Sequence, residues 1–531
     1  MHEWQKHFPF THVRDDQARA IDFAIEAYET GMKNVVLELG TGVGKSAVAI
    51  TLARWLKEQK ETSKTYILTS QKILQDQYAR DFSFVKDLRS AFNFHCETYD
   101  TSCGETMRIK RAMGKRKLDI VECVGECSYM ARKRAFKEAP IGVTNYSYFL
   151  SETAYAHGLV PRELLVFDEA HNVELELRKW ATINFTKKFA KDELGIIIPR
   201  SIKSSEDAIE WVKTKYLPAL ENVIGVTLSN IEIGLGELRS IETLRELMRK
   251  YASLDTHVCQ VNALMSTDTN GTRSRGRPED YLVDQTKDGF SLKPINITWQ
   301  AWRYLYSRSD KRLFMTASML DHQIFKRSIG LANAEDACLS IPSPFRPENK
   351  RIVYDPIGKM TMKHKHSSMS KLVEKVQKII DQHPNEKGIV HCHTYEISRA
   401  IKENILSKRL LVHDSNNREE TLEKHRSSKF PTILLSPSME EGVDLRDDLS
   451  RFQIICKVPF PYMGDPIIRM KLRKDHKWYA WTTMRMLIQA CGRSVRNEED
   501  HAITYILDES FGNFVKRNKN LVPKDFRFEV T

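Results

Sequence analysis

Residues 40–46 form a glycine-rich stretch that ends in a lysine and a serine, a combination suited to binding phosphate groups. Glycines allow the backbone to curl, so successive N–H groups can point at phosphate oxygens beside a helix N-terminus. In this interpretation Lys45 neutralises the β and γ phosphates of a nucleoside triphosphate, and the Ser46 hydroxyl binds Mg²⁺. The alternative is a chance glycine-rich turn. The predicted ligands of ATP and Mg²⁺ are Gly40, Thr41, Gly42, Gly44, Lys45 and Ser46.

An acidic pair, Asp168-Glu169, directly follows the apolar run Leu164–Phe167 and is continued by Ala170-His171. An acid at the end of a buried strand can reach the metal ion that a phosphate loop helps to hold. We expect Asp168 to hold Mg²⁺ through water, and Glu169 to orient and deprotonate the attacking water. Four residues alone carry little weight, but together with the phosphate loop they predict hydrolysis of ATP.

Near the C-terminus, residues 489–496 place two arginines three positions apart, on one face of a predicted helix. Delivered from a second domain, Arg493 and Arg496 could clamp the charge that develops on the γ-phosphate when the domains close. Surface arginines are the alternative, and the presence of the other two segments argues against it. The predicted catalytic residues are Lys45, Glu169, Gln489, Arg493 and Arg496.

Four cysteines lie between the phosphate loop and the acidic pair with the spacing C-x6-C-x19-C-x3-C, and they are Cys96, Cys103, Cys123 and Cys127. Four thiolates suit either Zn²⁺ or a [4Fe–4S] cluster, and the unequal spacing argues mildly against a zinc ribbon. The stretch 108–137 also carries ten basic residues against three acidic ones. This local excess predicts a surface that follows phosphate groups, with a solvated basic face as the alternative.

The hydrophobic pattern predicts two α/β domains with parallel sheets, because apolar strand signals alternate with helical ones. Expected strands cover 34–39, 65–69, 141–144, 164–167 and 313–315 in the first domain, and 388–391, 432–435, 454–458 and 503–507 in the second. Between the acidic pair and about residue 294, apolar residues recur at helical spacing. That spacing predicts a helical insertion at 172–294.

Size and charge limit the possible classes of protein. The chain has 531 residues, more than a single core accommodates, and its 82 basic and 70 acidic residues give a net charge of +12, which points to a polyanionic partner. No apolar run approaches the ~20 residues that span a membrane, and the first residues lack a secretory pattern. The number of cysteines, nine, is odd, and the five that follow Cys127 are scattered. We therefore expect a cytoplasmic protein in a reducing compartment, with no membrane partner.

The order of these segments resembles that of the superfamily 2 helicases, with a phosphate loop, a DEAH box and a QxxGRxxR segment. Residues 69–77 are similar to the motif that grips a strand backbone, and residues 314–319 to the coupling motif usually written around Ser-Ala-Thr. Residues 436–445 resemble the fifth motif, near the nucleotide–DNA junction, and residues 14–17 the motif on the adenine side. The nucleotide-site residues that these motifs imply are Gln17, Glu441 and Asp444.

Residues 127–133 and 143–150 closely resemble the XPD/DinG iron–sulfur helicases, one branch of that superfamily. In that family four cysteines hold a [4Fe–4S] cluster, and a helical arch follows the DEAH box. The resemblance therefore implies that such a cluster is bound by Cys96, Cys103, Cys123 and Cys127. It also implies a first RecA-like domain in 1–95, 141–171 and 295–345, an iron–sulfur insertion in 96–140, a helical arch in 172–294 and a second RecA-like domain in 346–531.

The implied activity is that of an ATP- and Mg²⁺-dependent DNA helicase with a role in DNA repair. It would act as a monomer on single-stranded and forked DNA, move 5′→3′ by family resemblance, and unwind the duplex. Two other functions stay open from the sequence. One is an ATP-gated clamp or remodeller that binds nucleic acid without separating strands, and the other is a redox-sensing DNA-binding protein. The sequence does not identify a protein partner.

Overall fold

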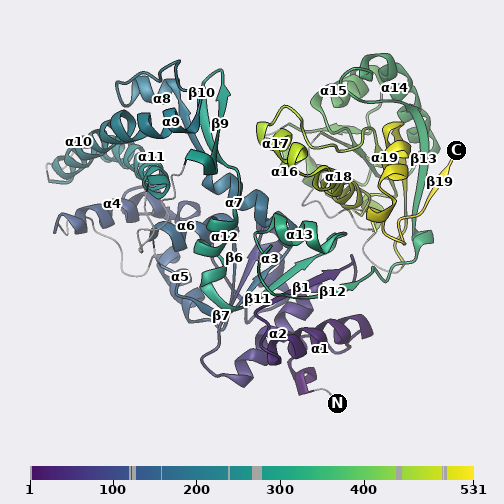
Figure 1. Cartoon of the computed structure of the whole chain (residues 1–531), viewed down its shortest axis with the longest axis horizontal. Helices are drawn as coiled ribbons and strands as arrows, with labels where there is room; N and C mark the ends of the chain where they lie inside the picture. Colours follow the sequence, from purple (N-terminus) through teal and green to yellow (C-terminus); the bar gives the residue numbers. More distant parts are fainter. Residues whose placement is uncertain are drawn as a thin grey trace.

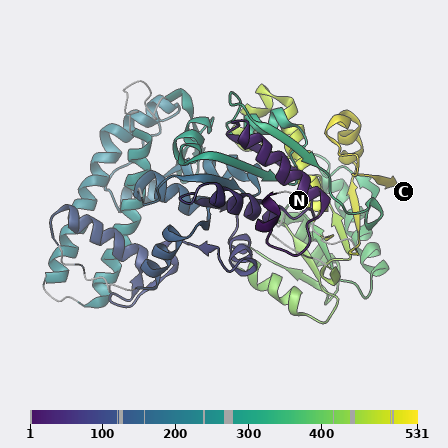
Figure 2. The same ribbon diagram turned by 90° about the horizontal axis from the view of Figure 1, so that it is seen from below.

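The computed structural model describes residues 3–118, 121, 127–156, 158–236, 240–265, 278–414, 417–437, 445, 447–492, 494–495 and 499–531. Two seven-stranded sheets form the cores of two α/β domains. Figure 1 shows the first domain at the bottom, near the N-terminus, and the second at the upper right, near the C-terminus. A third, mainly helical part rises from the first domain, and Figure 2 shows it on the side away from the C-terminus.

The first sheet has the strand order β12-β1-β11-β7-β2-β6-β3, and all its pairs are parallel. Its strands are β1 Asn34–Leu39, β2 Thr65–Thr69, β3 Lys86–Asp87, β6 Ile141–Asn145, β7 Arg162–Phe167, β11 Ser309–Thr316 and β12 Ala337–Ile341. Alternate residues of β1 face opposite sides, so Val35 packs in one buried cluster and Val36 in another. The helices of this domain include α1 Asp15–Glu29, α2 Lys45–Gln59, α3 Lys72–Asp81, α6 Tyr146–Ser151, α12 Thr298–Tyr304 and α13 His322–Ser328.

The second sheet has the order β15-β16-β14-β17-β18-β13-β19, again with parallel pairs. Its strands are β13 Lys350–Gly358, β14 Gly388–His391, β15 Leu410–Val412, β16 Ile433–Ser436, β17 Phe452–Ile455, β18 Ala502–Asp508 and β19 Phe528–Val530. Its helices are α14 Lys365–Gln382, α15 Tyr395–Asn404, α16 Arg418–Ser427, α17 Pro466–Lys474, α18 His476–Cys491 and α19 Ser510–Arg517. The predicted fold class, with two parallel-sheet α/β domains, is confirmed.

Two insertions interrupt the first domain. The cysteine-rich insertion, residues 96–140, begins within the short antiparallel pair β4 His95–Cys96 and β5 Thr101–Ser102 and contains α4 Cys103–Lys115 and α5 Ser128–Glu138. The helical insertion, residues 172–294, contains α7 Val173–Ala181, α8 Lys187–Asp192, α9 Ser205–Trp211, α10 Leu217–Gly236 and α11 Ile241–Met265. It also contains an antiparallel sheet that the helical spacing did not predict, formed by β8 Ile183–Thr186, β9 Tyr281–Thr286 and β10 Gly289–Pro294. Across the described ranges, no helix has both the length and the apolar character that a membrane crossing requires.

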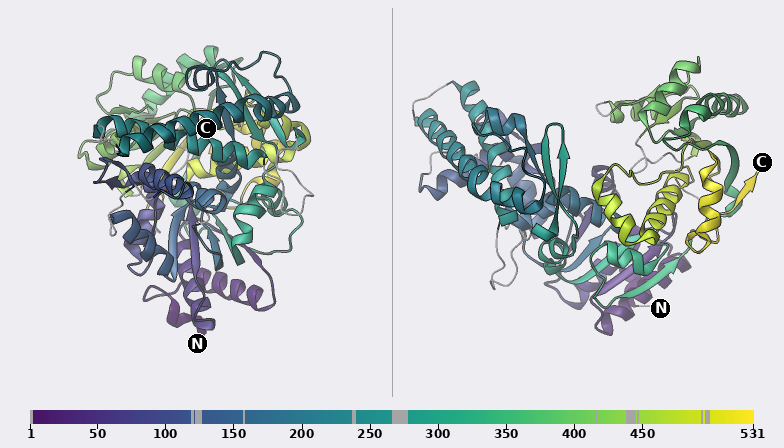
Figure 3. Two further views of the ribbon diagram at one scale, coloured as in Figure 1. Left: turned by 90° about the vertical axis from the view of Figure 1, so that its left-hand side faces the viewer. Right: turned by 45° about the horizontal axis from the view of Figure 1, so that its top comes forward.

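The two insertions contact each other through α4 and α11. Ile109 and Met113 of α4 share a buried apolar cluster with Met248 of α11. Two ion pairs flank this cluster, Arg108 Nη1–Asp255 Oδ2 at 2.5 Å and Arg116 Nη1–Glu232 Oε2 at 3.0 Å. Figure 3 shows the helical insertion and the second domain rising from the first domain on opposite sides. A ligand that lies across the first domain could therefore contact the helical insertion on one side and the second domain on the other.

Candidate functional site

The phosphate loop connects β1 to α2 and requires glycine at three positions. Gly42 and Gly44 have φ angles of +95° and +93°, a left-handed conformation that glycine adopts without strain. A Cβ at Gly40 would lie 2.2 Å from the backbone N of Ser343. One at Gly44 would lie 2.4 Å from Gln17 Nε2. Glycine is therefore required in this loop both by the backbone conformation and by the close approach of Ser343 and Gln17.

The segment that follows β12 covers this loop. Ser343 Oγ donates a hydrogen bond to Thr41 O at 2.8 Å. The buried ring of Phe345 lies against Gly42, where an added Cβ would come within 2.1 Å of it. Phe345 also packs with Val495 of the second domain in a small buried cluster. This segment links the phosphate loop to the second domain, and no motif in the sequence pointed to it.

We expect Gly42→Ala to lower the affinity for ATP about tenfold or more, because the methyl group will separate the loop from Phe345. Gly31→Ala is the matched control. Its glycine has a φ of +91°, but a Cβ there meets nothing within 4 Å. The control should lose about 1 kcal/mol of stability from backbone strain and keep its affinity. Titration with a fluorescent ATP analogue measures the affinity of each variant, and thermal unfolding measures its stability. Equal affinities in the two variants would contradict the role given to Phe345.

The carboxylate of Asp168 is buried immediately after β7. The Tyr78 hydroxyl donates to Asp168 Oδ2 at 3.1 Å, and the backbone N of Glu169 donates to Asp168 Oδ1 at 3.0 Å. Burial, followed by the negative charge of Glu169, raises the pKa of Asp168 to about 6. A cation bound at this carboxylate would favour its charged form, so the geometry suits a carboxylate that works with a metal ion.

Glu169 joins the acidic pair to the phosphate loop. Its backbone φ is +50°, a conformation that non-glycine residues adopt rarely and that is frequent at functional sites. Glu169 Oε1 lies 3.2 Å from Lys45 Nζ, and Glu169 Oε2 lies 3.3 Å from His171 Nδ1. The structure therefore brings together residues that are more than a hundred positions apart in the sequence.

His171 connects the acidic pair to both domains. Gln489 Nε2 of α18 donates to His171 Nε2 at 2.7 Å, so the other ring nitrogen carries the proton and donates to Thr316 Oγ1 at 3.0 Å. Arg485 Nη1, also of α18, donates to His171 O at 3.3 Å. A displacement of α18 would therefore shift His171, which contacts Glu169.

Glu38 organises a second link between the domains. Its Oε1 accepts hydrogen bonds from the backbone N of Met319 at 2.7 Å and of Leu320 at 3.0 Å. Ser340 Oγ donates to Glu38 Oε2 at 2.6 Å. Trp481 Nε1 of α18 donates to Met319 O at 2.6 Å. The sequence analysis missed Glu38, although an acid inside the otherwise apolar strand β1 was a usable signal.

The predicted nucleotide residues are only partly within the described part of the chain. Gln17 Oε1 accepts from Arg14 N at 3.0 Å, beside the phosphate loop. Arg14 Nη1 in turn donates to Gly42 O at 2.6 Å. The predicted residues that lie outside the described residues are Cys123, Glu441, Asp444, Arg493 and Arg496.

Two of the predicted cluster ligands are close to each other. Cys103 Sγ and Cys127 Sγ are 4.0 Å apart, and Cys96 lies in the same apolar cluster. Cys127 is the N-cap of α5, where its Sγ accepts the backbone N–H of Met130 at 3.4 Å. Among the residues that the structure describes, no three His, Cys, Asp or Glu side chains form a group that could hold a metal ion. The [4Fe–4S] cluster therefore stays a prediction.

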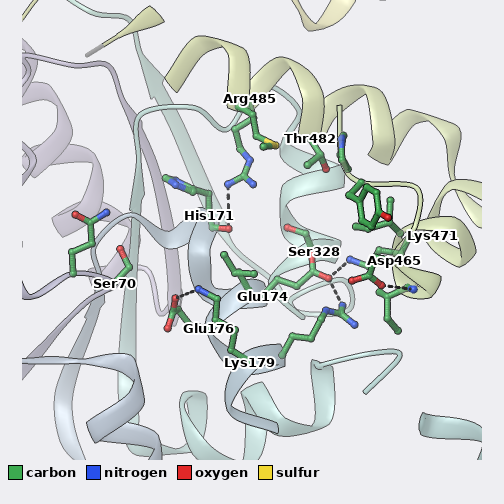
Figure 4. Close-up of a pocket in the computed structure, with 18 of the residues that line it drawn as sticks. Ser70, His171, Glu174, Glu176, Lys179, Ser328, Asp465, Lys471, Thr482 and Arg485 are labelled. Carbon is green, nitrogen blue, oxygen red and sulfur yellow. Dashed lines mark hydrogen bonds and ion pairs between the residues drawn. The ribbon is translucent and has the colours of Figure 1, made fainter. Parts of the chain in front are cut away.

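A cleft of about 770 Å³ lies between the first and second domains, next to His171 (Figure 4). Ser70 lines it on the side of the first domain, and Trp478 on the side of the second. Its basic lining residues are Lys72, Arg178, Lys179, Arg418, Lys471 and Arg485. Lys471 forms an ion pair with Glu174 and lies 4.3 Å from the centre of the Trp478 ring. The cleft therefore combines positive charge with aromatic surface.

A second cavity of about 500 Å³ lies where the first domain meets the two insertions. Its lining includes the aromatic residues Phe92, Tyr129, Tyr146, Tyr148 and Tyr155 and the basic residues Arg108 and Arg111. Ser70, Lys72 and Glu176 line both cavities, so the two adjoin. Tyr129, Tyr146 and Tyr148 are buried, whereas Phe92 is 46% exposed and Arg108 lies over its ring. A basic side chain beside an exposed aromatic ring suits a single-stranded nucleic acid, whose backbone is charged and whose bases stack.

Comparisons with known proteins agree with this arrangement. Residues 368–528 match the family described as "Helicase C-terminal domain", and residues 10–195 match the family described as "Type III restriction enzyme, res subunit". A probable ATP-dependent helicase of Methanocaldococcus jannaschii is 23% identical, over 96% of this chain and 93% of the relative. The ATP-dependent DNA helicase YoaA of Escherichia coli is 21% identical, over 95% of this chain and 92% of the relative. A solved structure titled "XPD_Helicase" has a TM-score of 0.66 at 13% identity and covers 98% of this chain and 100% of its own.

Fold and site together are those of helicase superfamily 2, with a phosphate loop and an acidic pair in the first of two parallel-sheet α/β domains. Within that superfamily, the chain is an XPD/DinG-like helicase, as the matched helicase domains and the named relatives show. Both named relatives are described as ATP-dependent helicases, and the family implies ATP and Mg²⁺ as cofactors. The predicted family is therefore confirmed.

Proposed function

We propose that this chain moves along single-stranded DNA in the 5′→3′ direction and unwinds duplex DNA at the expense of ATP. The observation that carries the proposal is the pair of adjoining cavities, about 770 and 500 Å³ in volume, which share Ser70, Lys72 and Glu176. A strand lying in both would contact the two motor domains and the two insertions. Closure of the nucleotide cleft would then move the wall formed by α17 and α18 along that strand.

The proposed hydrolysis begins with Lys45 and Ser46 at the phosphates. Lys45 binds the β and γ phosphates, while Ser46 and Asp168 offer the oxygen ligands that Mg²⁺ prefers, and the ion when bound neutralises phosphate charge. Glu169 orients the attacking water and takes its proton. In the structure Lys45 Nζ lies 3.2 Å from Glu169 Oε1. A bound triphosphate competes for Lys45 and so releases the carboxylate for water.

Further residues complete the proposed nucleotide site. The phosphate-loop and adenine-side ligands are Gln17, Gly40, Thr41, Gly42 and Gly44. From the second domain, Gln489, Arg493 and Arg496 act on the γ-phosphate, and Glu441 and Asp444 lie at the nucleotide–DNA junction. The proposed domains are 1–95, 141–171 and 295–345 for the first motor domain, 346–531 for the second, 96–140 for the cluster insertion and 172–294 for the arch.

The proposed [4Fe–4S] cluster is held by Cys96, Cys103, Cys123 and Cys127. The 4.0 Å separation between Cys103 Sγ and Cys127 Sγ supports a shared metal centre, because thiolates that bind one cluster lie close together. A bound cluster would cross-link a segment with a small apolar core of its own. Its proposed role is to fix the shape of the cysteine-rich insertion where the two DNA strands part.

Unwinding assays on duplexes with a 5′ or a 3′ single-stranded tail test the function. The protein is purified without oxygen, and we expect ATP-dependent unwinding of the 5′-tailed and forked duplexes by a species with the mass of one chain. Lys45→Ala serves as the control and should unwind neither substrate. Unwinding from a 3′ tail alone would refute the polarity. ATP hydrolysis that single strands stimulate without any unwinding would refute strand separation and favour an ATP-gated clamp.

A further inference from the structure

Tyr462, in the loop between β17 and α17, is one of the residues that line the 770 Å³ cleft. Its side chain is 76% exposed, and the neighbouring Met463 is 41% exposed. Large apolar groups that are exposed singly are common and need no explanation. The surroundings of Tyr462 set it apart, because its ring stands in the cleft that both motor domains line.

The loop that carries Tyr462 is held firmly. Arg469 Nη1 donates to the carbonyl oxygens of Met463 at 2.9 Å and Gly464 at 3.0 Å. The Tyr479 hydroxyl donates to Pro461 O at 3.1 Å. Side chains of α17 and α18 thus bind three carbonyl groups of the loop, on both sides of Tyr462. The exposed ring therefore stands on a fixed base and does not belong to a loosely held segment.

Asp465 and Gly464 fix the direction of the Tyr462 ring. Asp465 N donates to Tyr462 O at 3.0 Å, and Asp465 Oδ1 accepts from Ile467 N at 2.8 Å as the N-cap of α17. A Cβ at Gly464 would come within 2.1 Å of the Tyr462 ring, so the ring can lie over this position only when it is glycine. One face of the ring packs on its own loop, and the other remains open. Figure 4 shows Asp465 beside Lys471 in the wall of the cleft.

The charges around Tyr462 favour a nucleic acid as the occupant. Glu174 is neutralised within the cleft by Lys471 and by Arg178, whose Nη2 lies 2.5 Å from Glu174 Oε1. Arg485 and Lys72 add positive charge on facing walls. A phosphate backbone could follow these cations while one base covers the open face of the ring. A tyrosine loses little conformational freedom on stacking, particularly one that is already fixed.

We infer that Tyr462 forms a stacking subsite for one nucleobase of the single strand in the cleft. This inference rests on the proposed function, since it requires a single strand in that cleft. The loop moves as one piece with α17, which begins one residue after Asp465. A base stacked on Tyr462 is therefore carried along when the second domain moves. Tyr462 is a positioning residue for translocation and takes no part in ATP hydrolysis.

The test compares Tyr462→Ala and Tyr462→Trp with Tyr395→Ala, a matched control that removes a tyrosine 50% exposed in α15, away from the cleft. Affinity for a fluorescent single-stranded oligonucleotide is measured by anisotropy. We expect Tyr462→Ala to weaken binding about tenfold, in line with the loss of one stacked base, and Tyr462→Trp to restore it. The control and the thermal stability of every variant should match the parent.

A single abasic site, moved along the oligonucleotide, separates stacking from a structural role. At one position, loss of the base should weaken the parent as much as Tyr462→Ala does, and should not weaken Tyr462→Ala further. Parental affinity in Tyr462→Ala, or equal abasic losses in both proteins at every position, would overturn the subsite and leave the proposed function standing. A parent that binds no single-stranded oligonucleotide would overturn the proposed function and the subsite together.

Discussion

Glu169→Gln will abolish ATP turnover and leave ATP binding intact. The amide has the shape of the carboxylate but cannot take a proton from water, so turnover should fall by a factor of about 10² to 10⁴. Binding should be retained because the phosphate contacts come from the loop and from Lys45. The variant also removes the negative charge that pairs with Lys45, whose Nζ lies 3.2 Å from Glu169 Oε1. The measurements are kcat for DNA-stimulated hydrolysis and the dissociation constant of an ATP analogue.

Glu163→Gln is the matched control for this experiment. Glu163 lies on the same strand, β7, but at its opposite end, where it pairs with Lys60 at 3.2 Å and Lys311 at 2.9 Å. The same chemical change there should leave kcat at the parental value. Parental turnover in Glu169→Gln would mean that Glu169 is not the base. Loss of ATP binding would mean that its main role is to hold Lys45.

The strands that the sequence predicted well are buried on both faces. The limits of β1, β2 and β14 agree with prediction, because continuous apolar runs bounded by polar residues leave little choice. The prediction placed β17 two residues late, at 454–458, because the apolar run continues beyond the last paired residue. The edge strand β12 was missed, and most of its residues are half-buried or exposed, which weakens the apolar signal. The sheet of the helical insertion was missed because its strands mix polar with apolar residues, as in Tyr-Leu-Val-Asp-Gln-Thr of β9, within a segment where helical spacing dominates.

In the candidate site, too, the sequence predicted the residues of contiguous motifs and missed those that act through contacts distant in sequence. The phosphate loop and the acidic pair are contiguous segments, so their chemistry is legible in residue types and spacing. Phe345, Ser343 and Glu38 act through contacts with residues about 280 to 300 positions away, which no local pattern encodes. The role inferred for Tyr462 could not be predicted from the sequence, because it depends on the exposure of the ring and on a loop that is held in place. These are properties of the folded chain alone.

The contacts between the domains explain how hydrolysis could drive movement. Helix α18 holds the His171 ring through Gln489 at 2.7 Å and the coupling motif through Trp481, which donates to Met319 O at 2.6 Å. Asp475, the N-cap of the same helix, pairs with Arg327 of α13 at 3.0 Å. A change beside Glu169 is thus transmitted to one rigid element. That element also forms part of the wall of the cleft, so in the proposed function the nucleotide state would be mechanically linked to the position of the strand.

We expect Cys127→Ser to remove the proposed [4Fe–4S] cluster and to abolish the proposed unwinding while ATP binding persists. Serine is a favoured N-cap, so its hydroxyl can replace the Sγ that accepts from Met130 N and the start of α5 should be kept. Loss of a thiolate ligand is then the main change. Iron and sulfide content should fall to background, and the cysteine-rich insertion should become sensitive to proteolysis. Nucleotide titration should remain at the parental value, since the phosphate loop lies in the motor core.

Cys338→Ser provides the control for Cys127→Ser. Cys338 is also a half-buried free thiol, but it lies in β12 and is not among the proposed ligands. It should retain iron, sulfide and unwinding. Full iron content in Cys127→Ser would contradict the assigned ligand, and normal unwinding by an iron-free Cys127→Ser protein would contradict the structural role of the cluster. If iron and unwinding are lost together while ATP binding persists, the cluster shapes the strand-separating surface and the motor core folds without it.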